Sequence, residues 1–134
     1  MIDFTLLDGR HVARLATMTS PVPTCTIADV PEGAVLLDVR ENDEWAAGHA
    51  PSAVHVPMGQ VLQRLDELAT AFPDRPVRVV CRSGGRSARV TVALQQAGWD
   101  AVNVGGGMRA WAAAGRPMVA GSEATPSGVA PRVL

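Results

Sequence analysis

The chain has 134 residues, of which 47% are hydrophobic and 19% charged, so it is large enough for one globular domain with a buried core. Its formal net charge of −1 argues against nucleic-acid binding driven by bulk electrostatics. No apolar run approaches the length of a membrane span, and the N-terminus lacks the basic and apolar regions of a signal peptide. We therefore expect a cytoplasmic protein that binds neither nucleic acid nor a membrane.

The two ends of the chain differ from the part between them. Residues 1–22 show weak periodicity and run into the segment Thr19–Pro23, so we expect an N-terminal extension, with Met18 as an alternative start. Residues 120–134 are rich in glycine and proline and predict a flexible C-terminal tail. One domain is expected over residues 23–119.

Strand and helix patterns alternate within this central part. Runs rich in β-branched residues predict strands at 24–27, 34–39, 53–56, 77–80 and 101–104. Helical spacing predicts helices at 42–47, 59–71, 85–97 and 107–114, with Gly98 and Gly115 placed for left-handed caps. Valine-rich strands joined by helices indicate an α/β fold, a parallel sheet with helices on both faces. Ligands of such sheets bind at the carboxyl ends of the strands.

Cys81 stands at one of these carboxyl ends, directly before the loop Arg82–Ser87. A helix N-terminus follows, so backbone N–H groups and the positive end of the helix dipole are expected to point at its sulfur. Cys25, the other cysteine, lies in the first predicted strand and is expected to be buried and inert. Two cysteines are too few for a disulfide framework, and the three histidines are too scattered for a metal site.

The loop residues suit an anion. Arg82 and Arg86 bring positive charge that favours a thiolate. The pair Gly84 and Gly85 is expected to let the backbone curl so that successive N–H groups converge. The remaining two loop residues, Ser83 and Ser87, add hydroxyl donors. A buried structural cysteine followed by an ordinary turn would need fewer glycines and no flanking arginines.

The spacing between Cys81 and Arg86 separates two kinds of cysteine chemistry. It is C-x4-R, whereas cysteine phosphatases use C-x5-R, whose wider loop surrounds a tetrahedral phosphate. One residue fewer makes a tighter loop, suited to a single sulfur atom carried on the cysteine. The spacing therefore favours persulfide chemistry over a phosphatase or an arsenate reductase.

Four separated blocks resemble the rhodanese-like sulfurtransferases of the single-domain type, in the order of that family. They are Leu37–Glu41 with Glu44-Trp45, Gly48–Ala53 with Val56-Pro57, Cys81–Ser87, and Gly106–Met108 with Trp111 and Ala114–Pro117. The sequence departs from the family pattern at Ala50, Ser52 and Gly85, where isoleucine, glycine and asparagine are common. The resemblance implies a five-stranded parallel α/β/α domain, with Cys81 as the sulfur carrier and residues 82–87 as its binding loop.

The resemblance also implies a reaction. A thiosulfate or persulfide donor would load Cys81 with sulfur, and a thiol or cyanide would remove it, without a metal or an organic cofactor. A second hypothesis is a persulfide carrier or sensor that hands sulfur to a relay protein and turns over small donors poorly. Asp38 and Arg40 end a predicted strand and are expected to pair or to cap neighbouring loops near the site. A direct substrate role for Arg40 is the second choice.

Overall fold

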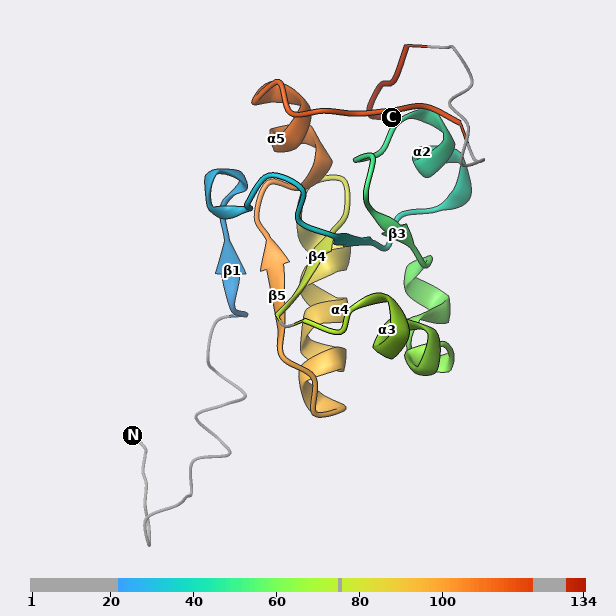
Figure 1. The fold of residues 1–134 in the computed structure, drawn as a ribbon, viewed down its shortest axis with the longest axis vertical. Coiled ribbons are helices and arrows are strands. Elements are labelled where there is room, and N and C mark those ends of the chain that lie inside the picture. Colours follow the sequence, from blue (N-terminus) through green and yellow to red (C-terminus); the bar gives the residue numbers. More distant parts are fainter. Residues whose placement is uncertain (1–21, 75, 122–129) are drawn as a thin grey trace, which may run out of the picture.

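The computed structural model describes residues 22–74, 76–121 and 130–134. Five parallel strands form one sheet in the order β1-β5-β4-β2-β3 (Figure 1). Their bounds are β1 Thr24–Cys25, β2 Leu36–Asp38, β3 Val54–His55, β4 Val77–Val80 and β5 Ala101–Val104. The predicted five-stranded parallel sheet is confirmed. The expected N-terminal extension, including Met18, lies outside the described residues except for Val22.

Helices connect the strands and cover both faces of the sheet. The α-helices are α2 Asn42–Ala47, α3 Leu65–Ala71, α4 Gly85–Gln96 and α5 Gly107–Ala113, and the 3-10 helices are η1 Ile27–Asp29 and η2 Met58–Gln63. Gly98 and Gly115 follow α4 and α5 with φ angles of 90° and 71°, as the cap prediction requires. Among the described residues, no helix is long and apolar enough to cross a membrane.

Several predicted elements differ from the structure, and the strands predicted over 34–39 and 53–56 are shorter, at Leu36–Asp38 and Val54–His55. The single helix predicted over 59–71 is η2 followed by α3, with a break at Arg64, whose φ of −120° is not helical. Val61 and Leu68 are both buried, so the apolar spacing gave no sign of this break. The first predicted strand ends early because the Asp29 carboxylate accepts hydrogen bonds from the Thr26 backbone and hydroxyl, which favours η1.

The core lies on both faces of the sheet. Leu37 and Val79 pack against residues of η2, α3 and α4, whereas Leu36 and Val80 pack on the opposite face against residues of η1 and α5. Fully burying such a side chain contributes about 1.5–3 kcal/mol. Cys81 belongs to the first of these two clusters and therefore lies on the α4 side of the sheet.

Parts of the segment expected to form a C-terminal tail lie against α2 (Figure 1). Gly121 N–H donates to the Ala46 carbonyl at 2.8 Å, and Arg132 N–H donates to the Ala47 carbonyl at 2.8 Å. These carbonyls belong to the last turn of α2, where no intrahelical donor is available. The described C-terminal residues therefore satisfy the end of the helix that carries Glu44.

Candidate active site

The sulfur of Cys81 receives hydrogen bonds from the loop and from the first turn of α4. Gly84 N–H lies 3.1 Å from Sγ, and the Ser87 hydroxyl lies 3.2 Å from it. Cys81 is only 1% exposed. Gly84 has a φ of 120°, which a side chain would strain, whereas Gly85 does not lie in the left-handed region. The curl expected from both glycines therefore depends on Gly84 alone.

These donors make the Cys81 thiol more acidic. Burial raises the pKa of the thiol, but hydrogen bonds from the Ser87 hydroxyl and from the backbone N–H groups of Ser87, Gly84 and Ser83 lower it. The resulting pKa lies below the ordinary value for cysteine. Hydrogen bonds, rather than the arginine side chains expected from the sequence, are thus the main support of the thiolate.

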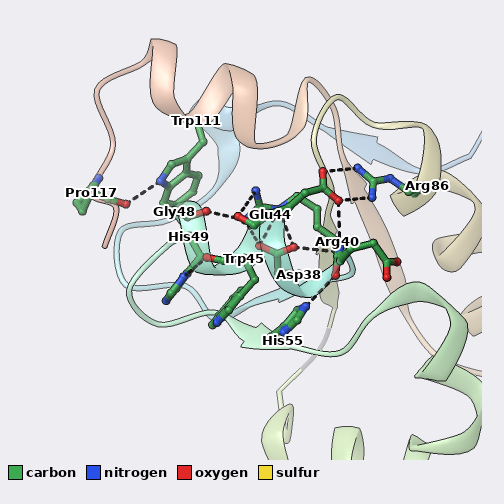
Figure 2. A network of polar contacts seen from close by, with 11 residues as sticks. Asp38, Arg40, Glu44, Trp45, Gly48, His49, His55, Arg86, Trp111 and Pro117 are labelled. Atoms are coloured by element: carbon green, nitrogen blue, oxygen red, sulfur yellow. Dashed lines mark hydrogen bonds and ion pairs between the residues drawn. The ribbon is translucent and has the colours of Figure 1, made fainter. Parts of the chain in front are cut away.

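Arg86 is bound to a carboxylate instead of facing the sulfur alone. Its Nη1 and Nη2 donate to Oε1 and Oε2 of Glu44 at 2.7 and 2.9 Å, across 42 residues of sequence (Figure 2). The Arg86 hydrogen bonds hold the pKa of Glu44 at about 2. This bidentate pair ties the first turn of α4 to α2. In the structure Arg86 therefore holds the loop in place, and its side chain is still 30% exposed; donor binding by Arg86 stays a prediction.

Arg82 differs from Arg86 in its surroundings. Arg82 is exposed, and its guanidinium makes no hydrogen bond or ion pair within the described residues. Arg82 thus remains a positive charge at the start of the loop that is available to an anionic donor.

Asp38 and Arg40 pair with each other below the loop. Arg40 Nη2 donates to Asp38 Oδ2 at 2.7 Å and to the Gly48 carbonyl at 2.8 Å, and both side chains are fully buried (Figure 2). Arg40 Nη1 also donates to the Glu44 carbonyl at 3.3 Å. A substrate has no access to this guanidinium, so Arg40 supports α2 and the turn after it.

Three rings stack beside this network. The Trp45 ring lies between His49, at 3.5 Å, and His55, at 4.7 Å, with nearly parallel planes (Figure 2). His49 Nδ1 bonds to the Trp45 carbonyl and His55 Nε2 to the Arg40 carbonyl, both at 2.8 Å. Both histidines therefore bind backbone, and within the described residues no group of three or more metal-ligating side chains occurs.

The N-terminus of α5 holds the base of the loop, a contact that the sequence analysis missed. Met108 N–H donates to the Cys81 carbonyl at 2.8 Å, and Arg109 N–H donates to the Arg82 carbonyl at 3.0 Å. A side chain on Gly107 would overlap the Cys81 carbonyl oxygen, and the φ of Gly107 is 58°. Only glycine allows α5 to approach the Cys81 carbonyl this closely.

Asn103 is a second residue that the sequence analysis missed. Its Oδ1 lies within hydrogen-bond distance of the Ser87 hydroxyl, at 2.6 Å, and Asn103 is only 6% exposed. A signal was present in the sequence, because asparagine interrupts the apolar run Ala101–Val104 at a position that faces the core side of Ala101.

Cys25 takes no part in this site. It packs on the sheet face opposite Cys81 and is separated from it by strand β5. Strands two apart are about 10 Å from each other, which is too far for a disulfide. The expectation that Cys25 is buried is wrong: it is half-buried, because it lies on the edge strand β1, and burial still raises the pKa of its thiol.

The sequence profile of the Rhodanese-like domain family matches residues 27–114. The chain belongs to the rhodanese-like domain family. It is 40% identical over 90 residues to a sulfurtransferase of Allochromatium vinosum, a match that spans 66% of this chain and 81% of that protein. The resemblance inferred from the four sequence blocks is thus confirmed.

Solved structures of rhodanese-like proteins have the same fold. A rhodanese-related protein from Thermoplasma volcanium aligns with a TM-score of 0.64 and 30% identity, over 72% of this chain and 97% of that one. A thiosulfate sulfurtransferase from Pseudomonas aeruginosa aligns with a TM-score of 0.62 and 26% identity, over 86% of this chain and 23% of that one. The family match supports sulfur transfer as the general class of reaction.

Proposed function

We propose that this rhodanese-like chain is a sulfurtransferase in which Cys81 carries the sulfur. The observation that carries the proposal is the position of Sγ at the end of β4, where the Gly84 N–H and the Ser87 hydroxyl both reach it. Donors aimed at one sulfur atom favour its anionic form, which is the nucleophile.

The reaction has two steps. The Cys81 thiolate attacks the outer sulfur of thiosulfate or of a persulfide, the sulfur–sulfur bond of the donor breaks, and sulfite or a thiolate leaves with the bonding electrons. Cys81 then holds a persulfide. A thiol or cyanide attacks the terminal sulfur, and the Cys81 thiolate is released with the electrons of the broken bond. Donor and acceptor thus react in turn with one cysteine.

The surroundings of the site restrict the reagents. Cys81 is nearly fully buried, so only a slender donor or acceptor reaches Sγ without displacing the loop. Arg82 offers its charge to an anionic donor, whereas the charge of Arg86 is balanced by Glu44. Thiosulfate, which is small and anionic, fits both restrictions.

Intact mass measurement tests the proposal. Incubation with thiosulfate is expected to add the mass of one sulfur atom, and cyanide is expected to remove it and release thiocyanate. Cys81→Ser abolishes both changes, whereas Cys25→Ser, the matched control on the opposite face of the sheet, leaves them intact. Sulfur addition that persists in Cys81→Ser and disappears in Cys25→Ser would overturn the assignment.

A persulfide carrier that serves a protein acceptor is the second candidate. A groove between η2 and α4 is lined by Met58, Leu62, Arg89 and Ala93, and Leu62 is 57% exposed. Exposed apolar surface of this kind favours contact with a protein. Rapid loading from thiosulfate followed by slow release to small thiols would support the carrier, whereas rapid multiple turnover with cyanide or small thiols would support the enzyme.

A further inference from the structure

The side chains of Cys81, Ser87 and Asn103 form a buried chain of polar groups behind the reactive sulfur. Ser87 Oγ lies 3.2 Å from Cys81 Sγ and 2.6 Å from Asn103 Oδ1. The three residues are 1%, 0% and 6% exposed. A hydroxyl has only one proton, so Ser87 cannot donate to the sulfur and to Asn103 at the same time.

We propose that Asn103 is a positioning residue that acts on the Cys81 sulfur through Ser87. Its side-chain amide turns when Cys81 changes between thiol and thiolate, so that the Ser87 hydroxyl has a hydrogen-bond partner in both charge states. The proposal rests on the proposed function in one respect, that the anionic sulfur is the reactive form. It adds a residue of β5 to the control of the sulfur, whose direct donors come from the loop after β4 and the first turn of α4.

The two charge states require opposite hydrogen-bond directions. When Cys81 is a thiol, its S–H donates to Ser87 Oγ, and the Ser87 O–H donates to Asn103 Oδ1. When Cys81 is a thiolate, the Ser87 O–H turns to Sγ, and its oxygen is then free to accept. A half-turn of the Asn103 amide brings Nδ2 into the place of Oδ1 as the donor. Oxygen and nitrogen of an amide have nearly the same size, so this turn needs no repacking.

The backbone of Asn103 is held on both sides, so only its side chain has to turn. Asn103 pairs with Val79 of β4 and Thr24 of β1, and its N–H donates to the Pro23 carbonyl at 2.8 Å. Its Nδ2 lies 4.0 Å from the place that a side chain on Gly84 would take, next to the other donor to the sulfur. A carboxylate here would only accept, and it would keep the Ser87 proton away from the sulfur.

The charged groups around Cys81 in the described part of the chain make no hydrogen bond to the polar series Cys81–Ser87–Asn103. They are Arg86 of α4 paired with Glu44 of α2, the Asp38–Arg40 pair at the end of β2, and the exposed Arg82 and Arg109 of the loop and α5. None of these side chains bonds to Ser87 or Asn103 within the described residues. Changes at Asn103 therefore reach the sulfur through Ser87 or through direct repulsion, and the experiment separates these two routes.

The test is the pH dependence of Cys81 alkylation by iodoacetamide in a double-mutant cycle, in a Cys25→Ser background so that one thiol is measured. Asn103→Asp is expected to raise the midpoint by about one pH unit, which lowers the thiolate fraction at neutral pH about tenfold. In the Ser87→Ala background the same substitution is expected to change the midpoint much less. An equal rise in both backgrounds would assign the effect to direct charge repulsion and overturn the proposal, and so would the absence of any rise.

A measurement on the protein with Asn103 unchanged gives a second test if Asn103→Asp fails to fold. The Nδ2 proton signals of Asn103, followed by NMR, are expected to shift at the same pH as the Cys81 alkylation midpoint, and Ser87→Ala is expected to remove the shift. Nδ2 proton signals whose chemical shifts do not change across the Cys81 titration would refute the proposal. Both tests work without a sulfur donor, so their failure is distinct from a failure of Cys81 to accept sulfur from thiosulfate.

Discussion

The ion pair between Glu44 and Arg86 predicts a specific dependence of stability on pH. Arg86 holds the pKa of Glu44 at about 2, compared with 4.5 for an ordinary glutamate. Each pH unit of difference corresponds to about 1.4 kcal/mol, so a shift of this size corresponds to roughly 3 kcal/mol. Because the side chains of Arg86 and Glu44 are 30% and 14% exposed, we reduce this to about 2 kcal/mol.

The sign follows from the direction of the shift. A carboxyl group whose pKa is lowered by folding contributes its stability above its ordinary pKa. That contribution is lost as the pH falls from 4.5 to about 2, where the folded group takes up its proton. Glu44→Gln lacks the titration, so the difference in unfolding free energy between wild type and variant should be constant near neutral pH and decrease across this window.

Urea unfolding of both proteins at a series of pH values measures this difference. Glu67→Gln is the matched control, because Glu67 also pairs with an arginine, Arg64, but its side chain is 62% exposed. We expect the control to leave the profile nearly unchanged. A difference between wild type and Glu44→Gln that stays the same from neutral pH to about pH 2 would show that the pair does not stabilise the fold as argued.

Four further predictions concern the loop. Arg86→Ala should lower the unfolding free energy by about 2 kcal/mol, because it breaks the pair with Glu44. Arg82→Ala should change the unfolding free energy by less than about 0.5 kcal/mol and should instead raise the KM for thiosulfate. Equal effects of the two substitutions on unfolding would contradict the difference in their surroundings. Gly107→Ala should reduce sulfur transfer and stability, whereas Gly85→Ala, which has open space, should be tolerated in both assays. Alkylation of Cys81 should have its midpoint below about 8.5, the value for a free cysteine, and a higher midpoint would mean that the amides do not hold the thiolate. Hydrolysis of an aryl phosphate should be undetectable, since we expect the C-x4-R loop to be too tight for phosphate. Hydrolysis that is present in the wild type and lost in Cys81→Ser would instead show that Cys81 acts as the nucleophile of a phosphatase.

Local sequence was enough to predict the strand, loop and helix that hold Cys81. A valine-rich run, a cysteine, a glycine-rich turn and a helical pattern follow one another within residues 77–97, and the structure has β4, the loop and α4 in these places. The same holds for the caps at Gly98 and Gly115, whose conformations depend on the helix that each one ends. The break at Arg64 was hidden, because η2 and α3 bury Val61 and Leu68 as one helix would.

The partners of the loop residues were decided only by the tertiary structure. Glu44 meets Arg86 across 42 residues, Asn103 meets Ser87 across 16, and α5 reaches the carbonyls of Cys81 and Arg82. The sequence predicted that the positive charge of Arg86 would act on the Cys81 sulfur. A sequence pattern shows that a charged residue is present, but it does not show which opposite charge that residue pairs with. Such pairs depend on the strand order β1-β5-β4-β2-β3, which brings distant segments to one edge of the sheet. Backbone conformation is set mainly by neighbours along the chain, whereas a side chain finds its partner only after the sheet has assembled.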